Sequence, residues 1–334
     1  EALFESFDPE PLAAASLSQV HKAVLMNGQR VVVKVQRPQI DKVINLDLEI
    51  LLGIMRLVEK HIPESRVYEP VAKFEEFADA MRKELDFTQE SWNIEKFQRN
   101  FEGDEVIYVP RIYEEFTTKK VITMEYIEAA KVSELCSEQG IIREEAAKNV
   151  AKAMMKQIFV HGFFHGDPHP GNILVRPDGR IVFIDFGLMG RIDVITKHKL
   201  AEFIIGVMNQ DSERVSRAIL DISHVDHHLD EAKFEMDVED LVERYYDKTL
   251  KQINIASLLN EVFALVARYR IVLPSNFTLL LKSLITVEGV GRELDPNFNV
   301  FEVAKPFVKK LLREYYGPRQ FVRGSVDKIE ELGE

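Results

Sequence analysis

The first third of the chain alternates between two hydrophobic periods. Val31–Val35 is a β-branched run around one lysine. It follows "LAAASLSQVHKAVLMNGQR", in which Asn27-Gly28 is a strong hairpin signal. This stretch predicts a strand, a small-residue turn, a second strand, a tight turn and a third strand. Apolar residues then recur at helical spacing and predict helices over Ile40–His61, from Pro70 to beyond Met81, and over Thr88–Asn100.

Strand patterns return in "VIYVPRIYEEFTTKKVITMEYI", and the pattern after it is mostly helical. We expect helices over Ser133–Gln139 and Glu144–His161, and several more from Lys197 to Tyr316. The exception is "ILVRPDGRIVFIDFG", which predicts a short hairpin turned at Pro177-Asp178-Gly179. A β-rich first part joined to a helical remainder predicts an α+β fold of two lobes, 1–127 and 128–334, with a cleft. Trp92 and the phenylalanines at helical spacing are expected in the core.

Composition limits the class of protein. The chain has 334 residues, of which 46% are hydrophobic, enough for two packed lobes. Its net charge of −12 argues against a general nucleic-acid binder. The only cysteine, Cys136, excludes an intramolecular disulfide and fits a reducing compartment. No apolar run approaches the roughly 18 residues of a membrane span, and no signal peptide is evident. Because the chain does not begin with Met, we expect a fragment.

Candidate chemistry lies in "FFHGDPHPGNILV" and "IVFIDFGLMG". Asp167 follows a predicted helix and could orient, or accept a proton from, an attacking hydroxyl or water. Asn172 could offer its amide oxygen, and Asp185 its carboxylate, to a divalent ion that bridges nucleotide phosphates; such ligands suit Mg²⁺ or Mn²⁺. Alone, "HGD" could be a turn and "DFG" a helix or strand terminus. Together they predict a metal-phosphate site.

Lys34 has two interpretations. A lone lysine in an apolar strand usually faces outward by alternation. Its place also matches the lysine that binds the α- and β-phosphates in kinases, a role that needs a carboxylate partner from a helix.

Four stretches carry a family resemblance: "AAASLSQVH", "VVVKVQRP", "ELDFTQESWN" and "HGDPHPGN…IDFG". Nearly the whole chain resembles the UbiB/ADCK family of atypical kinase-like proteins, the aarF-domain proteins tied to ubiquinone and other isoprenoid-lipid metabolism. The resemblance implies a protein-kinase-like fold, with a helical insertion in the small lobe, that binds ATP with Mg²⁺ or Mn²⁺. It also implies ATPase activity or phosphorylation of a small or lipid-related molecule.

The resemblance assigns a role to the alanine-rich turn, in which Ala13, Ala14, Ala15 and Ser16 replace the glycine-rich phosphate loop. Alanine restricts the backbone and adds a Cβ where glycine would allow close approach, so the loop should hold nucleotide differently. The alternative is that small residues simply pack a tight turn.

Further roles follow from the same resemblance. Glu90 would pair with Lys34, and Glu125 and Ile127 would offer backbone groups to adenine. Glu84 and Asp86 match a regulatory Glu-x-Asp motif that faces a Lys-x-Gly-Gln motif on an amino-terminal extension. That partner motif is absent from this chain, which fits a fragment. Without the family, these acids on a charged helix would be a solvated face.

Two departures from ordinary kinases disfavour a protein substrate. Gly166 replaces the arginine that reads activation-loop phosphorylation, and no Ala-Pro-Glu follows Gly187. Two rivals remain: a small-molecule kinase of the aminoglycoside or choline type, and a nucleotide-gated scaffold. We expect an isoprenoid lipid or membrane surface and proteins of quinone biosynthesis as partners, no nucleic acid, and a cytoplasmic or organellar location peripheral to a membrane.

Histidines offer a further, weaker signal. His165 is expected to orient the catalytic loop, and His169 could lie near substrate. His224 and His228 are four apart and could share a zinc ion on one helix face, but no third and fourth ligands are evident nearby.

Overall fold

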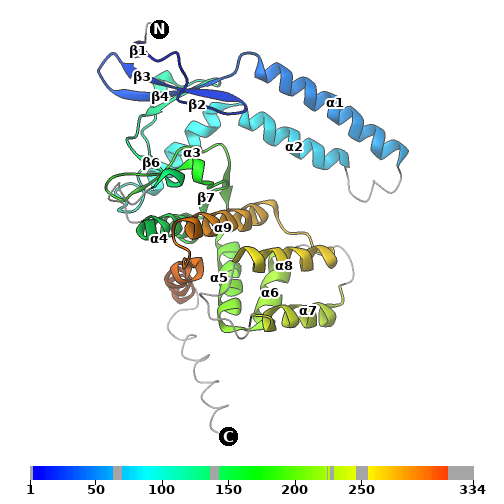
Figure 1. Ribbon diagram of the computed structural model, residues 1–334. Helices are drawn as coiled ribbons and strands as arrows, with labels where there is room; N and C mark the ends of the chain where they lie inside the picture. Colours follow the sequence, from blue (N-terminus) through cyan, green and yellow to red (C-terminus); the bar gives the residue numbers. More distant parts are fainter. Residues whose placement is uncertain are drawn as a thin grey trace. The chain divides into compact units, whose positions relative to one another are not determined.

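The computed structural model describes residues 3–62, 70–135, 143–223, 225, 229–245 and 255–314 (Figure 1). Cys136, His224 and His228 lie outside these ranges, so the zinc hypothesis is not addressed. The chain divides into two compact units. The first unit comprises Glu1–Gly103, Val109–Glu128 and Ile184–Leu188, and the second comprises Asp104–Tyr108, Ala129–Phe183 and Met189–Glu334. Each unit is described by itself.

The first unit is built on an antiparallel sheet. Its strands are β1 (Phe4–Phe7), β2 (Ala13–Ala14), β3 (Ser18–Leu25), β4 (Arg30–Gln36) and β5 (Val121–Glu125). They are ordered β1-β3-β4-β5, with β2 paired to β3. The predicted turn between β3 and β4 is present, and Gly28 takes a φ of 81° there, which glycine adopts without strain. The expected succession of strand, turn, strand, turn and strand is confirmed.

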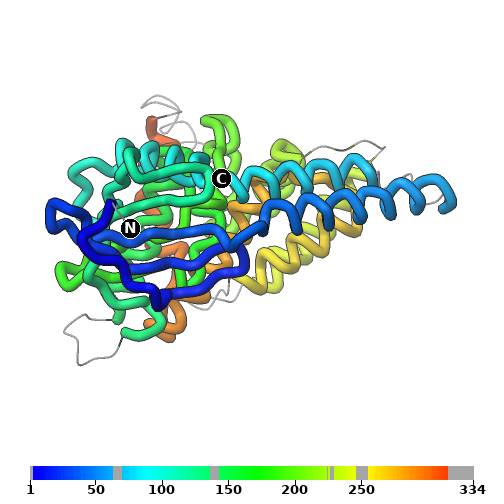
Figure 2. The backbone as a smooth tube through the Cα atoms, turned by 90° about the horizontal axis from the view of Figure 1, so that it is seen from above, coloured from blue at the N-terminus to red at the C-terminus, as the bar shows by residue number. Residues whose placement is uncertain are grey.

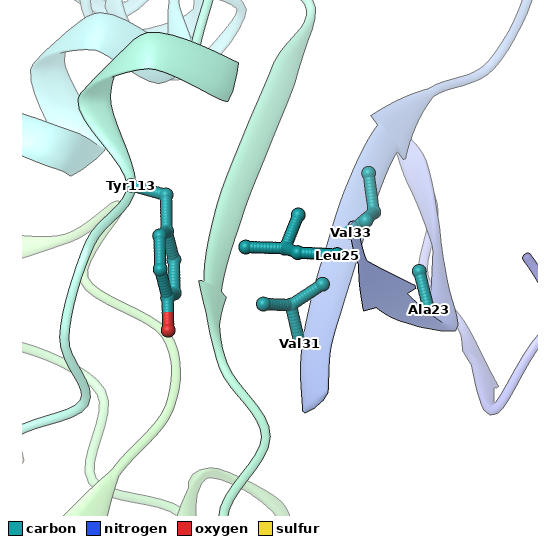
Figure 3. Packing of buried hydrophobic residues seen from close by; sticks show 5 residues of the cluster. All are labelled: Ala23, Leu25, Val31, Val33 and Tyr113. Atoms are coloured by element: carbon teal, nitrogen blue, oxygen red, sulfur yellow. The ribbon is translucent and has the colours of Figure 1, made fainter. Parts of the chain in front are cut away.

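Alternation along β4 sorts its side chains between two faces. Val31 and Val33 pack with Ala23, Leu25 and Tyr113 in a hydrophobic cluster (Figure 3). Side chains in a strand point alternately to opposite faces, so Lys34 lies on the face away from this cluster. The valines on either side of Lys34 therefore fix which way it points.

Three helices complete the first unit. They are α1 (Ile40–His61), α2 (Pro70–Glu84) and α3 (Phe87–Asn100), close to the predicted bounds. Helices α1 and α2 run side by side (Figures 1 and 2). The expectation that Trp92 lies in the core is wrong: it is 41% exposed, and Lys96 Nζ lies 5.5 Å from the centre of its ring. On α3 the buried apolar positions are filled by Phe87, Ile94 and Phe97.

In the second unit, short strands lie among helices. Helix α4 (Arg143–Met155) continues as a π-helical turn, η5 (Lys156–His161). The short strands are β6 (Ala130–Lys131), β7 (Phe163–His165), β8 (Ile173–Val175), β9 (Ile181–Phe183) and β10 (Met189–Arg191). Strands β8 and β9 form the predicted hairpin, and β7 pairs with β10. The later helices include α5 (Val194–Asn209), α6 (Ser212–Ile222), α7 (Glu231–Glu243), α8 (Ile255–Arg268) and α9 (Ser275–Leu294), and residues 300–314 are also helical.

Two sequence expectations are met only in part. The pattern at "VIYVPRIY" forms isolated bridges at Ile107 and Ile112 rather than a regular strand. Pro110 lies between them and has no N–H to give to a ladder. Most of the helix expected over Ser133–Gln139 lies outside the described residues, and the described part contains a short 3-10 helix, η3 (Val132–Glu134). No helix in the described ranges is both long enough and apolar enough to span a membrane.

Candidate functional site

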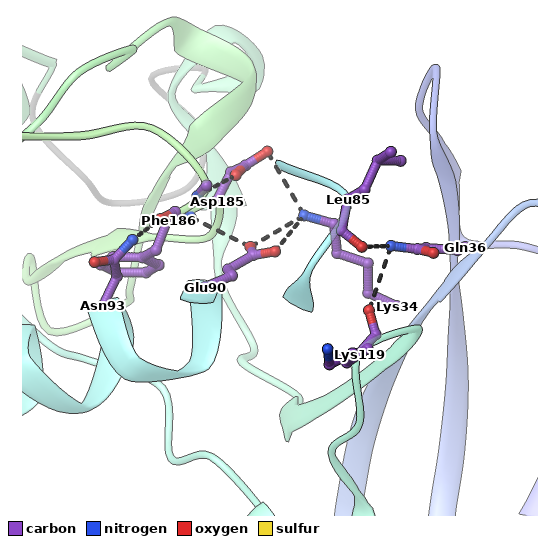
Figure 4. Close-up of polar contacts among 9 residues, drawn as sticks. Lys34, Gln36, Leu85, Glu90, Asn93, Lys119, Asp185 and Phe186 are labelled. Atoms are coloured by element: carbon purple, nitrogen blue, oxygen red, sulfur yellow. Dashed lines mark hydrogen bonds and ion pairs between the residues drawn. The ribbon is translucent and has the colours of Figure 1, made fainter. Parts of the chain in front are cut away.

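A buried ion pair forms the centre of the first unit's candidate site. Lys34 Nζ donates to Oε1 and Oε2 of Glu90 at 3.0 and 2.9 Å (Figure 4). The two side chains are only 15% and 4% exposed. Lys34 comes from β4 and Glu90 from the first turn of α3, so the pair joins the sheet to the helix. The outward-facing interpretation of Lys34 and the solvated-face interpretation of Glu90 therefore do not describe this structure.

The Asp-Phe-Gly segment is attached to the same helix. The N–H of Phe186 donates to Glu90 Oε1 at 3.3 Å, and Asn93 Nδ2 donates to the Phe186 carbonyl at 2.9 Å. The Phe186 ring meets Phe97 edge-on, with centroids 5.1 Å apart. These contacts place Asp185 Oδ2 3.8 Å from Lys34 Nζ (Figure 4).

Charge at this point favours an ionised lysine. Burial alone would lower the pKa of Lys34, but the carboxylates of Glu90 and Asp185 outweigh it and raise that pKa above its ordinary value. Partial desolvation, followed by the charge of Asp185, raises the pKa of Glu84. Several carboxylates gather around one ammonium, an arrangement to which a divalent cation could bind.

The alanine-rich turn lies beside this cluster. Ala13 and Ala14 form β2 against Gln19 and Val20, and Ala15 begins the turn into β3. Arg37 fixes this turn, because its Nε and Nη2 donate to the Ala15 carbonyl at 3.2 and 3.1 Å. The stretch is thus a tight turn, as the simpler interpretation held, and it also borders a pocket.

That pocket has a volume of about 100 Å³. It is lined by residues of the turn (Ala15, Ser16, Leu17, Ser18), of the α2–α3 junction (Lys83, Glu84, Asp86, Phe87, Gln89, Glu90), and by Lys34, Asp185 and Gly187. Pockets that enclose a whole small ligand measure several hundred Å³. This one has room for a phosphate-sized group beside Lys34. Ala13 and Ala14 do not line it.

Glu84 and Asp86 differ in their surroundings. Glu84 is the last residue of α2 and borders the pocket. Asp86 caps α3, because its Oδ1 accepts from the Thr88 N–H at 3.0 Å and from the Thr88 hydroxyl at 2.6 Å. Asp86 therefore has a structural role as the N-cap of α3, and this role does not depend on the Lys-x-Gly-Gln motif.

Main-chain groups of the expected adenine-binding segment are partly engaged. The N–H of Glu125 donates to the Arg111 carbonyl at 2.8 Å, and that of Tyr126 donates to the Arg30 carbonyl at 3.1 Å. The N–H of Glu125 is therefore already used within the fold. Ile127 lies in the irregular stretch that follows β5.

The second unit holds the other predicted residues. Asn172 Nδ2 donates to the Asp167 carbonyl at 3.3 Å, and His165 Nδ1 accepts from the Asp167 N–H at 3.2 Å. His165 is buried and stacks on Phe183, whereas His169 is exposed and accepts from the Gly171 N–H. The structure thus brings Asp167 and Asn172 together in one loop, and His165 lies where it can orient that loop.

The donor set fits a magnesium-type ion. Among the residues described, no group of three or more His, Cys, Asp or Glu side chains could hold a metal. Mg²⁺ commonly takes only one or two carboxylates and fills its shell with water and phosphate oxygens. Asp185 is 44% exposed beside the pocket, so its carboxylate is accessible to such an ion.

Several positioning residues have no counterpart among the sequence predictions. Gln36 and Arg37 lie within the quoted "VVVKVQRP", and alternation places Gln36 on the same face as Lys34, where it donates to the Leu85 and Lys119 carbonyls (Figure 4). The alternation of side chains along the strand could therefore have predicted that Gln36 lies near the site. Asn93 and Ser283 act over long sequence separations, for which one sequence holds no signal. Gln157 acts on His165, only eight residues further along the chain.

Comparisons with known proteins identify the family. Residues 1–219 match the ABC1 atypical kinase-like domain, and residues 238–299, which include α9, match the UbiB helical domain. The chain therefore belongs to the ABC1/UbiB family of atypical kinase-like proteins. The resemblance inferred from the sequence is confirmed.

Similar proteins come from bacteria and plants. The chain is 36% identical to an uncharacterized protein of Synechocystis over 94% of its own length and 54% of the relative's. It is 33% identical to the probable protein kinase UbiB of Aliivibrio fischeri MJ11, over 97% of this chain and 61% of that protein. It is also 33% identical to a chloroplastic protein of Arabidopsis named ACTIVITY OF BC1 COMPLEX KINASE 7, over 93% of this chain and 45% of that protein. The chain spans about half the length of these relatives.

A solved structure shares the fold. The Rv3197–erythromycin complex from Mycobacterium tuberculosis matches with a TM-score of 0.69 at 22% identity, over 91% of this chain and 77% of that one. With the family match, this confirms the expected kinase-like fold, with a β-sheet amino-terminal region and a mainly helical carboxyl-terminal part.

Proposed function

We propose that this chain binds ATP with Mg²⁺ or Mn²⁺ and transfers its γ-phosphoryl group to water or to a hydroxyl of a small or lipid-related molecule. The observation that carries the proposal is the contact of Lys34 with both Glu90 and Asp185. A lysine held by a helix carboxylate next to the Asp of Asp-Phe-Gly is the arrangement that kinase-type phosphoryl transfer requires.

Each residue has a defined task in this proposal. Lys34, oriented by Glu90, binds the α- and β-phosphates, while Asp185 and Asn172 hold the metal ion. The ion, when bound, neutralises charge on the phosphate oxygens. Asp167 orients the attacking hydroxyl or water and accepts its proton. Alanine in the turn limits how closely the backbone approaches the phosphates.

A small acceptor is favoured over a peptide. Gly187 is followed within a few residues by β10 and then by α5, whose first turn is capped by Asp193. This leaves little chain for an activation segment that could present a peptide. The relatives named as probable protein kinases, and the family's link to ubiquinone, support phosphoryl transfer in isoprenoid-lipid metabolism at a membrane surface, with proteins of quinone biosynthesis as partners.

The proposal is tested by phosphate release from ATP with and without isoprenoid-containing membranes, in the wild type and in Asp185→Asn. We expect metal-dependent release that membranes increase and that Asp185→Asn abolishes. A hydroxyl-substrate screen with isotopically labelled ATP identifies any acceptor other than water. Release that persists unchanged in Asp185→Asn contradicts the proposed mechanism.

An assay of cellular function distinguishes the proposed phosphoryl transfer from the alternative of a nucleotide-gated scaffold. If Asp167→Asn and Asp185→Asn both retain cellular function while loss of ATP binding abolishes it, nucleotide-gated switching rather than chemistry is the activity.

A further inference from the structure

A π-helical turn lies directly before the catalytic loop. Helix α4 widens over Lys156–His161 and ends at Gly162, whose φ of 62° is left-handed. Such wide turns in α-helices are frequent at functional sites because they re-aim side chains. A Cβ at Gly162 would lie 2.6 Å from the Ile192 carbonyl oxygen, so the chain can turn closely there only with glycine.

Gln157, in this turn, holds the strand that leads to Asp167. It is fully buried, and its Oε1 accepts from the His165 N–H at 2.8 Å. Its Nε2 is also buried and makes no hydrogen bond within the described part of the chain. A buried donor without a partner destabilises a fold. An apolar side chain at position 157 would avoid the cost of this unpaired amide group. The glutamine therefore contributes something that an apolar residue could not, namely the hydrogen bond that its Oε1 accepts from the His165 N–H.

Ser283 holds the next peptide group from a distant helix. It lies on α9, is fully buried, and its Oγ is 3.0 Å from the Gly166 carbonyl oxygen. The same hydroxyl lies 2.8 Å from the carbonyl of Leu279, one turn earlier in α9. A serine hydroxyl has one proton, so it donates to one of these carbonyls at a time. Gly166 is itself buried and needs a donor.

The main chain of Asp167 is thus fixed on both sides. Before it, the His165 N–H and the Gly166 carbonyl are held by Gln157 and Ser283. After it, the carbonyl of Asp167 accepts from the His169 N–H at 2.9 Å. All these groups lie in the second unit, whereas Lys34, Glu90 and Asp185 lie in the first.

We propose that Gln157 and Ser283 are positioning residues for Asp167, and that Ser283 lets helix α9 of the helical domain set the place of the catalytic loop. The inference rests on the proposed phosphoryl transfer. A carboxylate displaced by a fraction of an ångström orients its nucleophile poorly, and such displacements lower rates strongly. Lys34 and Asp185 of the first unit carry most of the proposed phosphate and metal binding, and only Asn172 of this loop takes part in it, so the effect should fall on kcat more than on nucleotide affinity.

The test compares Ser283→Ala and Gln157→Met with Thr286→Ala. Thr286 is the matched control, because it lies on the same helix and donates to the Lys282 carbonyl, also one turn earlier, at 3.0 Å. We expect Ser283→Ala to lower the rate of phosphate release about tenfold or more while the nucleotide Kd changes less than twofold. Gln157→Met should act in the same direction. Thr286→Ala should match the wild type.

Amide hydrogen exchange over residues 163–172 provides a readout that needs no activity. Ser283→Ala and Gln157→Met should speed exchange there while the rest of the second unit keeps its protection. If the wild type releases no phosphate, the proposed function fails, and exchange still decides whether these residues hold the loop. The inference is overturned by unchanged exchange over 163–172, by protection lost equally throughout the unit, or by a fall in nucleotide affinity that matches the fall in rate.

Discussion

The ammonium of Lys34 lies 2.9 Å from Oε2 of Glu90 and 3.8 Å from Oδ2 of Asp185. One side chain therefore connects strand β4, helix α3 and the Asp-Phe-Gly segment. The connection is electrostatic, and it is reinforced by hydrogen bonds from the Phe186 N–H to the Glu90 carboxylate and from the Asn93 side-chain amide to the Phe186 carbonyl. Removing Lys34 or Glu90 breaks a pair whose side chains are only 15% and 4% exposed.

We expect Glu90→Gln and Lys34→Met each to lower the free energy of unfolding by about 3 kcal/mol, because each breaks the buried Lys34–Glu90 ion pair by removing one of its charges. The double variant should lose less than the sum of the two, since neither charge then remains. Urea unfolding of the three variants measures this coupling.

The exposed pair Arg82–Asp79 is the control for this cycle. Its side chains are 48% and 69% exposed, and removing either should cost less than about 1 kcal/mol. Strictly additive losses at Lys34 and Glu90 would show that the contact is not energetically coupled.

The sequence predicts the elements better than their contacts. The apolar repeat from Ile40 to His61 is long and regular, and α1 has those bounds. Periodicity placed Lys34 in a strand but could not say which face it takes, because that depends on the partners of β4. For Trp92 the sequence predicted a buried side chain, and the prediction was wrong, since an aromatic residue at helical spacing need not face the core.

Site residues follow the same division. Lys34, Glu90 and Asp185 could be named from motifs because the chemistry restricts residue type and spacing. Ser283 could not, because its bond to Gly166 joins residues 117 positions apart and any helix could carry a serine. Asp86 is an intermediate case. Its N-cap hydrogen bond from the Thr88 N–H is local, so it could have been predicted from the sequence at the break between α2 and α3.

Ala14→Gly should change nucleotide affinity by about two- to fivefold, because glycine frees the backbone next to the pocket-lining Ala15 by roughly 0.5–1 kcal/mol. The change also loosens β2, so the melting temperature without nucleotide should fall slightly. Titration calorimetry with ATP and Mg²⁺ measures the affinity. Ala130→Gly is the matched control, an alanine in the two-residue strand β6. An unchanged Kd in Ala14→Gly would remove the turn from the mechanism.

Asp185→Asn should remove the metal-dependent part of nucleotide binding, since a neutral amide attracts a divalent ion weakly. In the wild type, nucleotide at about 100 times its Kd should add about 2.7 kcal/mol of stability in Mg²⁺ and less in EDTA. In Asp185→Asn the two melting curves should coincide. Asp79→Asn, on the exposed face of α2, should behave like the wild type. Equal stabilisation of the wild type with EDTA and with Mg²⁺ would show the metal assignment to be wrong.

Asp104 provides a pH test in the second unit. Burial opposes its ionisation, but hydrogen bonds from Lys156 and from the N–H groups of Val106 and Ile107 outweigh it and lower its pKa. An acid with a lower pKa in the folded state stabilises the fold above its unfolded pKa, and loses that stabilisation as pH falls through the folded pKa. Asp104→Asn should therefore cost about 2 kcal/mol at pH 7 and progressively less below about pH 4, in urea unfolding. Asp240 is exposed, and Asp240→Asn should show no such pH dependence. If Asp104→Asn lowers the free energy of unfolding by the same amount at every pH, the charge of Asp104 is not what stabilises the fold.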